Sequence, residues 1–277
     1  MADKDCIELV GKIGSVALID GRNGTIDYNK FARLGRQLAP GMVWVSSGAT
    51  EIGRLDYHKR TGRSLDEDDD TAKTDYAAQG QAILMQLYRE FIPSAYSVRQ
   101  LLVEHQHFND EKKREHIKRF LLRCAEQAAV PIVNYNDSVS DEETRKLEIH
   151  KLVETRGEAV QLVDNDETAA QIANLLHAKR LIIFMNGVGI CKNVGDPSTL
   201  IKTIGGATAE QVVKNIEEVK SYCVGASRKG AFGAAAKLDY IESCIDGGTT
   251  VYIASADCDI ADVISGAAPC TAIGVGL

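Results

Sequence analysis

Two lysines in this chain of 277 residues belong to glycine-containing segments that are far apart in the sequence. Lys12 belongs to Gly-Lys-Ile-Gly-Ser at 11–15, which follows an apolar run, 7–10, that predicts a β-strand. Lys237 ends a stretch of small residues, 225–237, that leads into a predicted helix. Glycines let a phosphate approach the backbone, and lysine adds a positive charge. Both segments are candidate phosphate sites, with a surface turn and a flexible loop as the alternatives, and the P-loop pattern itself is absent.

A pair of hydroxyl residues follows another predicted strand. The strand covers 42–45, and the sequence Ser46-Ser47-Gly48-Ala49 comes directly after it. A helix that begins here would offer its first backbone N–H groups to an anion. Ordinary capping of that helix by serine is the alternative.

Amide and carboxylate side chains form two clusters. Asn134-Tyr135-Asn136-Asp137 follows a strand predicted over 130–134, and Asp164-Asn165-Asp166 comes later in the chain. Amides can bind both ends of a zwitterion, whereas a carboxylate can pair with an ammonium group or orient a lysine. Turn formation explains either cluster alone, but two in succession favour a site for a small polar metabolite.

The elements that must position these residues alternate between strands and helices. Strands are predicted at 7–10, 16–19, 42–45, 98–103, 130–134, 180–184, 250–254 and 271–275, and helices at 28–38, 71–91, 111–128, 167–176, 209–219 and 234–245, with a weak hairpin at 146–157. This alternation predicts an α/β fold, a three-layer αβα sandwich around a mostly parallel sheet. Ligands bind beyond the carboxyl ends of such strands, so the polar clusters are expected there.

Composition narrows the class of protein. The chain has 32 basic and 39 acidic residues, a net charge of −7, which argues against a nucleic-acid binder. Its polar N-terminus lacks the apolar core of a signal peptide, and no window approaches the roughly 18 apolar residues of a membrane span. We therefore expect a cytoplasmic protein without a membrane partner. His105 and His107 are expected to be structural or exposed rather than metal ligands.

The order of these motifs resembles that of the amino acid kinase family, and within it the glutamate 5-kinase branch. The resemblance covers roughly residues 7–275. It implies an enzyme that uses ATP and Mg²⁺, with the metal held through ATP rather than by protein ligands. The implied reaction phosphorylates the side-chain carboxylate of glutamate to an acyl phosphate, a step of proline biosynthesis. It also implies a reductase partner that receives the acyl phosphate, and a homo-oligomer.

The resemblance assigns roles to individual residues. It implies one continuous domain with an acceptor-binding lobe, 1–177, and a nucleotide-binding lobe, 178–277. Lys12 and Lys237 would hold the transferring phosphoryl group, and Asp166 would orient both lysines. The expected acceptor-binding residues are Ser47, Gly48, Ala49, Asn134, Asn136, Asp137 and Asn165, and the expected nucleotide-binding residues are Gly14, Ser15, Met185, Asn186, Gly230 and Gly233.

Several positions depart from the family pattern, all on the nucleotide side. Ser15 is followed by Val16 rather than by a second hydroxyl residue, and Met185-Asn186 replaces Thr-Asp. The family's Gly-Thr-Gly-Gly-Met is reduced to Gly-Ala-Phe-Gly-Ala at 230–234. Two alternatives therefore stay open. One is a kinase of the same fold for another acceptor, such as a nucleoside monophosphate, a phosphate monoester or another amino acid, and the other is a non-catalytic binding or regulatory protein. We also expect a protein without the RNA-modification-type domain that bacterial members of the resembled family often carry.

Overall fold

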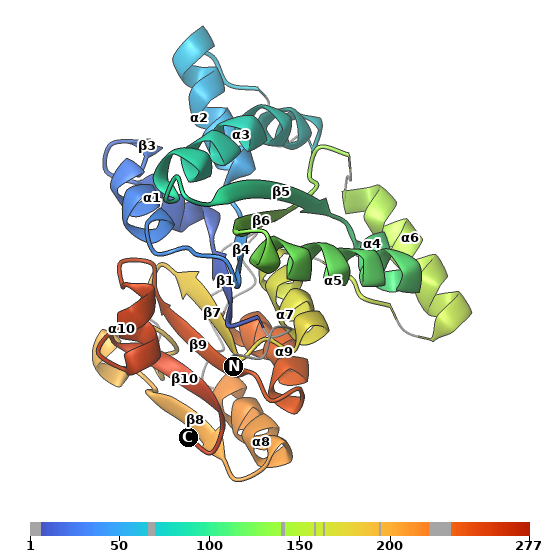
Figure 1. Cartoon of the computed structure of the whole chain (residues 1–277), viewed down its shortest axis with the longest axis vertical. Helices are drawn as coiled ribbons and strands as arrows, with labels where there is room; N and C mark the ends of the chain where they lie inside the picture. Colours follow the sequence, from blue (N-terminus) through green and yellow to red (C-terminus); the bar gives the residue numbers. More distant parts are fainter. Residues whose placement is uncertain are drawn as a thin grey trace. The chain divides into compact units, whose positions relative to one another are not determined.

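The computed structural model describes residues 7–65, 70–139, 142–157, 159–162, 164–193, 195–221 and 234–277 (Figure 1). The strands are β1 (Leu9–Ile13), β2 (Ile19–Asp20), β3 (Thr25–Ile26), β4 (Met42–Ser46), β5 (Ser97–Val103), β6 (Ala129–Tyr135), β7 (Arg180–Met185), β8 (Thr203–Gly206), β9 (Thr250–Ser255) and β10 (Cys270–Val275). The helices are α1 (Tyr28–Gly35), α2 (Ala49–Thr61), α3 (Asp70–Phe91), α4 (His105–Asn109), α5 (Glu111–Glu126), α6 (Glu142–Arg156), α7 (Asn165–Leu176), α8 (Ala209–Lys220), α9 (Ala234–Asp246) and α10 (Ile260–Ser265), with short 3₁₀ helices η1 (Ser15–Leu18) and η2 (Pro197–Thr199).

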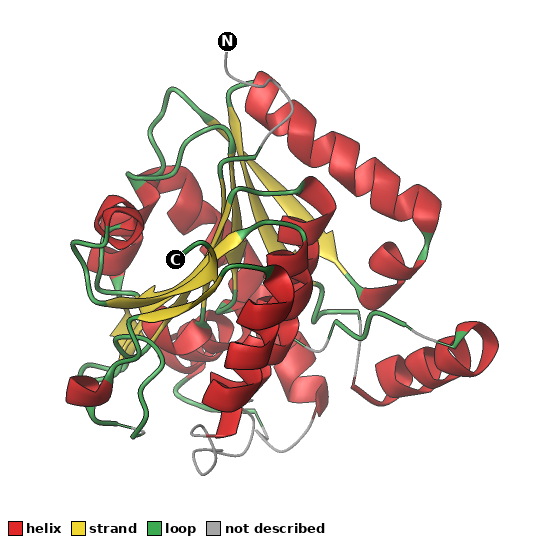
Figure 2. Ribbon diagram, turned by 90° about the horizontal axis from the view of Figure 1, so that it is seen from below, coloured by secondary structure: helices red, strands yellow, loops and turns green. Residues whose placement is uncertain are grey.

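Eight strands form one sheet in the order β5-β6-β4-β1-β7-β9-β10-β8. The pairs β5/β6, β6/β4, β1/β7, β7/β9 and β8/β10 are parallel, and β9/β10 is antiparallel. Helices lie on both sides of the strands, which are yellow in Figure 2. The expected αβα sandwich with a mostly parallel sheet is confirmed.

The chain divides into two compact units. Unit 1 comprises Met1–Ile13, Gly41–Val43 and Asp166–Leu277, and unit 2 comprises Gly14–Pro40 and Trp44–Asn165. The candidate residues therefore fall into two groups, one in each unit, and each group is built by its own strands and helices.

In unit 1, β1, β7 and β9 run parallel, so their carboxyl ends lie at the same edge. All five residues of β1 are buried, as expected for a strand covered on both faces. Helix α9 packs against β9 and β10, and α8 packs against α9, β8 and β10. Leu238 and Ile241 anchor α9 in the core with no exposed side-chain surface.

In unit 2, α2 and α3 cross at close range (Figure 1). The contact passes through two glycines, Gly53 in α2 and Gly80 in α3. A Cβ added to Gly53 would lie 1.8 Å from the backbone oxygen of Tyr76, and one added to Gly80 would lie 1.8 Å from that of Ala49. Glycine at both positions therefore lets the two backbones touch, which fixes the start of α2 next to α3.

Two predicted elements are wrong. Residues 16–19 were predicted as a strand, but residues 16–18 belong to the 3₁₀ helix η1. The prediction failed because a short apolar run does not distinguish a strand from a helical turn. The hairpin predicted at 146–157 lies in α6 instead. Glu, Lys, Arg and Leu, all strong helix formers, dominate this segment, and His150 pairs with Glu154 one turn later.

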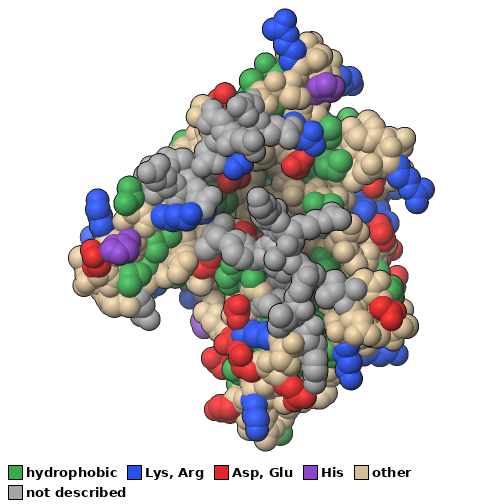
Figure 3. Space-filling model, turned by 180° about the vertical axis from the view of Figure 1, so that it is seen from behind, with side chains coloured by type: hydrophobic (Ala, Val, Ile, Leu, Met, Phe, Trp, Pro, Cys, Tyr) green, Lys and Arg blue, Asp and Glu red, His purple; other side chains and the backbone are tan. Residues whose placement is uncertain are grey.

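Acidic and basic side chains are interspersed over the described surface of the face in Figure 3. None of the helices in the described part of the chain combines the length and the hydropathy that a membrane span needs.

Candidate active site

A carboxylate between two ammonium groups is the main charged feature of unit 1. Lys12 Nζ lies 2.6 Å from Asp166 Oδ1, and Lys237 Nζ lies 2.5 Å from Asp166 Oδ2. Lys12 comes from the end of β1, Asp166 from the first turn of α7, and Lys237 from the first turns of α9. The structure thus brings together three residues that are far apart in the sequence. We call them the lysine–aspartate cluster.

The cluster is largely shielded from water. The exposed fractions of the side chains are 8% for Lys12, 5% for Asp166 and 15% for Lys237. Burial acts to raise the pKa of Asp166, but the charges of both lysines and their hydrogen bonds outweigh it and hold that pKa below its usual value. The carboxylate is therefore ionised at neutral pH, and the cluster carries an excess positive charge.

The other residues expected to bind the nucleotide follow neighbouring strands. Met185 ends β7, which pairs with β1, and Asn186 directly follows it and is exposed. Gly14 caps η1, and Ser15 is the first residue of that helix. Gly230 and Gly233 lie outside the described residues.

A cavity of about 240 Å³ in unit 2 collects most of the residues expected to bind the acceptor. It is lined by Ser15, Ser47, Gly48, Ala49, Thr50, Glu51, Tyr135, Asp137, Asp164 and Asn165. Its volume lies below the range of about 300–1,000 Å³ that drug-sized ligands occupy, so it suits a small metabolite. Ser15, expected on the nucleotide side, lines this acceptor cavity as well.

One wall of the acceptor cavity is the N-terminus of α2. Gly48 precedes the helix with φ +108°, a left-handed conformation that strongly favours glycine. A Cβ there would also come within 3.0 Å of Leu18. Because glycine has no side chain to cap the helix, the first backbone N–H groups of α2 are available to an anion.

Asn165, which lines the cavity, is hydrogen-bonded to Asn134, which does not. Asn165 donates through Nδ2 to Asn134 Oδ1 at 2.8 Å and to Ser47 Oγ at 3.1 Å, and its Oδ1 accepts from the backbone N–H of Tyr135. Asn134 in turn donates to Gln81 Oε1 at 2.8 Å and is 1% exposed. In the structure Asn134 supports Asn165 and Ser47 from behind and does not line the cavity.

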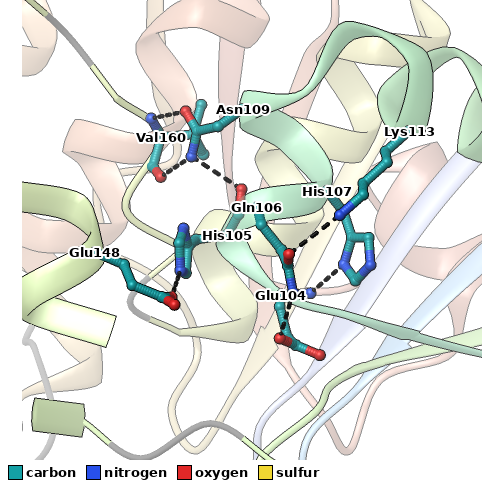
Figure 4. A network of polar contacts seen from close by, with 8 residues as sticks. All are labelled: Glu104, His105, Gln106, His107, Asn109, Lys113, Glu148 and Val160. Atoms are coloured by element: carbon teal, nitrogen blue, oxygen red, sulfur yellow. Dashed lines mark hydrogen bonds and ion pairs between the residues drawn. The ribbon is translucent and has the colours of Figure 1, made fainter. Parts of the chain in front are cut away.

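Asn136 does not line the acceptor cavity either. It donates to Glu104 Oε1 at 3.1 Å and accepts from Ser138. Glu104 precedes α4, and its backbone N–H donates to His107 Nδ1, while His105 Nε2 lies 2.7 Å from Glu148 of α6 (Figure 4). Both histidines thus have structural partners that fix α4, and Glu104 fixes the turn that carries Asp137.

Burial changes the titration of Asp137, one of the residues that line the cavity. Burial raises the pKa of Asp137 to about 6, and the positive charge of Arg145 opposes that rise. Arg145 itself lies 5.6 Å from the ring centroid of Tyr135, another residue of the cavity wall. The charge of Asp137 therefore changes close to neutral pH.

Tyr135, Thr50, Glu51 and Asp164 also line the cavity. Tyr135 and Asp164 belong to the two polar clusters predicted from the sequence but had no role of their own, and Thr50 and Glu51 were not singled out. Thr50 and Glu51 occupy the first turn of α2, directly after Gly48-Ala49, so a helix predicted from residue 49 could have included them. Glu51 accepts a hydrogen bond from Arg54 Nη2 at 2.9 Å. With Asp137 and Asp164 it makes the described lining of the cavity acidic.

A larger cavity of about 770 Å³ lies along β8 and α8 in unit 1. It contains none of the expected site residues. Two of its three glycines are explained by packing, because a Cβ on Gly205 would lie 2.3 Å from the backbone oxygen of Leu277 and one on Gly206 would lie 2.9 Å from Gln211. The cavity gives no reason to move the candidate site away from the lysine–aspartate cluster.

The model of the amino acid kinase family matches residues 8–255. The chain belongs to the amino acid kinase family. This family consists of ATP-dependent phosphotransferases, so the expected enzyme class and the expected use of ATP with Mg²⁺ are confirmed at the level of the family.

Curated relatives in the amino acid kinase family are similar over most of this chain. The glutamate 5-kinase of Alkaliphilus metalliredigens is 29% identical over 258 residues, which are 90% of this chain and 87% of that protein. The glutamate 5-kinase of Dehalococcoides mccartyi (strain CBDB1) is 31% identical over 265 residues, which are 92% of this chain and 64% of that protein. The chain therefore spans nearly all of the first relative and just under two thirds of the second.

Solved structures with the amino acid kinase fold are similar in shape but distant in sequence. The carbamate kinase from Giardia lamblia bound to AMP-PNP aligns with a TM-score of 0.58 at 12% identity, covering 98% of this chain and 99% of that one. The UMP kinase from Ureaplasma parvum aligns with a TM-score of 0.54 at 14% identity, covering 98% of both chains. At identities this low, the similarity supports the fold alone and says nothing of the acceptor of this chain.

Proposed function

We propose that this chain transfers the γ-phosphate of ATP to the side-chain carboxylate of glutamate and releases ADP and an acyl phosphate. The observation that carries the proposal is the acceptor cavity, which offers N–H donors at one wall and carboxylates at another. An amino acid is a zwitterion that needs both. The two glutamate 5-kinases described above support glutamate as the amino acid.

The lysine–aspartate cluster supplies the charge that this reaction needs. A carboxylate oxygen attacks the γ-phosphorus, the bond to ADP breaks, and negative charges come together in between. An ammonium group has three N–H donors, so Lys12 and Lys237 can each contact Asp166 and still donate to phosphoryl oxygens. Mg²⁺ arrives with ATP as part of that substrate. Because a carboxylate is ionised at neutral pH, the acceptor needs no general base.

The charges of the acceptor cavity favour an amino acid over the alternative acceptors. Asp137, Glu51 and Asp164 attract an ammonium group, whereas they repel the phosphate of a nucleoside monophosphate or a phosphate monoester. Among the described lining residues, none is a lysine or an arginine. The alternative of a non-catalytic protein is disfavoured by a different feature, since the lysine–aspartate cluster is present.

The wider context of the proposed reaction follows from its product. An acyl phosphate hydrolyses readily, so a reductase partner that consumes it is part of the proposal. A cytoplasmic location, a homo-oligomer and the division of roles between residues 1–177 and 178–277 are proposed on the family resemblance.

Hydroxylamine trapping tests the proposed function. The purified protein is incubated with Mg-ATP, hydroxylamine and one acceptor at a time: glutamate, aspartate, carbamate or UMP. We expect a hydroxamate to form with glutamate, because hydroxylamine captures an acyl phosphate. ADP release with UMP and none with glutamate would replace the proposed acceptor, and thermal stabilisation by no nucleotide at all would contradict the kinase function.

The pH dependence of kcat/KM for glutamate tests the role of Asp137. An ammonium group binds to the ionised form of the carboxylate, so kcat/KM should rise as pH increases through about 6 and then level off. Glutamate's own side-chain carboxyl titrates near about 4.3 and does not produce this step. In Asp137→Asn the step should vanish, and KM for glutamate should increase about tenfold or more. A wild-type profile that is flat between pH 5 and 7.5 would remove Asp137 from the acceptor shell.

A further inference from the structure

A second group of ion pairs in unit 1, centred on Lys220, connects α8 to α9. Lys220, the last residue of α8, lies 2.5 Å from Asp239 Oδ1 and 2.6 Å from Glu242 Oε1, both on α9. It also pairs with Glu217 on its own helix. Although the carboxylates are partly exposed, the Lys220 side chain is only 15% exposed. Burial acts to lower the pKa of Lys220, but the three carboxylates outweigh it and raise that pKa above its usual value.

This arrangement differs from an ordinary surface ion pair. An isolated pair gains little, because it orders two long side chains in water. Here one ammonium group serves three carboxylates whose oxygens lie within 4.8 Å of one another. Without Lys220, these three negative charges would repel one another, and α8 and α9 would be pushed apart at this point.

The ion pairs of Lys220 act on α9, the helix that carries Lys237. Lys237 and Asp239 are two positions apart in α9, so their side chains leave the helix in nearly opposite directions. Lys237 reaches Asp166 on one side, while Asp239 and Glu242 reach Lys220 on the other. The apolar contacts of the helix fix where its axis lies, and ion pairs on its two sides fix its rotation about that axis.

We propose that Lys220 is a positioning residue, which holds α9 through Asp239 and Glu242 so that the Lys237 ammonium group stays on Asp166. The proposal rests on the proposed function only for the catalytic use of Lys237. The position of Lys237 itself can be measured without any assay of activity.

The test compares Lys220→Met and Lys220→Arg with Lys214→Met, which removes an exposed lysine from the same helix. Each protein is treated briefly with an amine-acylating reagent well below its melting temperature, and mass spectrometry gives the rate at which Lys237 is modified. An ammonium group held in a shielded ion pair reacts slowly. We expect the rate to rise about tenfold in Lys220→Met, to return towards wild type in Lys220→Arg, and to be unchanged in Lys214→Met.

Kinetics supply the second readout. Misplacing a catalytic group by about 1 Å can cost on the order of a hundredfold in rate. We expect kcat to fall at least about tenfold in Lys220→Met, with KM for glutamate unchanged. A general loss of stability would lower the melting temperature and leave the acylation of Lys237 at its wild-type rate.

The outcomes separate the two proposals. Unchanged acylation of Lys237 in Lys220→Met overturns the positioning role, whatever the kinetics are. Faster acylation in a protein whose wild type does not phosphorylate glutamate supports the positioning role and overturns the proposed acceptor. If Lys220→Met does not fold, Asp239→Asn tests the same contact while Glu242 keeps its partner, and it should raise the acylation rate by a smaller factor.

Discussion

Replacing either lysine of the lysine–aspartate cluster by methionine should lower kcat about a thousandfold while the fold stays intact. A unit charge at about 4 Å contributes roughly 4 kcal/mol at an effective dielectric of about 20, and about 1.4 kcal/mol corresponds to a factor of ten in rate. Methionine keeps most of the length and the apolar stem of lysine and removes the charge. Steady-state kinetics with Mg-ATP and glutamate measure the loss, and thermal denaturation measures the fold.

The fold should survive because Asp166 retains one partner in each single variant. In Lys12→Met the carboxylate still pairs with Lys237, and in Lys237→Met it still pairs with Lys12. Lys179→Met is the matched control, since it removes a half-exposed lysine that pairs with Glu8 on the surface, and its kcat should stay within about twofold of wild type. Turnover within tenfold of wild type in both cluster variants would mean that these ammonium groups do not meet the transferring phosphoryl group.

The central strands β6 and β7 could be predicted from the sequence because most of their residues are buried. β6 is buried at all seven of its residues, and β7 at four of its six, so each reads as a continuous apolar run. The bounds of helix α3 were predicted to within one residue, because apolar residues recur at helical spacing along its 22 residues. Short or polar elements carry no such signal, and η1 and α6 were missed for that reason.

The candidate site was only partly predictable. The residue types at 134–137 predicted a polar cluster at the end of a strand, but they did not predict which of its side chains line the cavity. Asn136 and Asp137 are adjacent, yet Asn136 turns to Glu104 whereas Asp137 lines the cavity. That choice depends on Glu104, the residue before α4, which is the partner of Asn136 although it lies 32 positions earlier in the chain. The meeting of Lys12, Asp166 and Lys237 likewise follows from the fold, and the sequence interpretation reached it through the family resemblance.

The acceptor cavity depends on a packing contact with α3, a helix that does not itself line the cavity. Ala49 and Glu51 belong to the first turn of α2, and α3 presses against this turn through Gly80. Since the N–H groups that would bind an anion are those of the same turn, any change that lifts α2 from α3 should affect the binding of the acceptor before it affects the lysine–aspartate cluster.

Gly80→Ala should therefore be strongly destabilising and should also weaken acceptor binding. The new Cβ would lie 1.8 Å from the backbone oxygen of Ala49 and 2.5 Å from the backbone nitrogen of Gly53. Neither atom belongs to a flexible side chain, so the helices must separate. Overpacking typically costs about 1–3 kcal/mol, and a backbone clash of this size belongs at or above the upper end of that range, about 3 kcal/mol. Alanine is otherwise the better helix former by about 1 kcal/mol, so propensity alone predicts a gain.

The backbone clash predicts a loss of stability and helix propensity predicts a gain, so the sign of the measured change in stability distinguishes the two effects. Chemical denaturation should give a lower free energy of unfolding for Gly80→Ala, and KM for glutamate should rise more than KM for ATP. Gly21→Ala is the matched control, because a Cβ there meets nothing within 4 Å, and it should change stability by less than about 0.5 kcal/mol. A Gly80→Ala protein as stable as wild type, with an unchanged KM for glutamate, would mean that α2 and α3 do not cross as closely as the structure has them and that the start of α2 is held by other contacts.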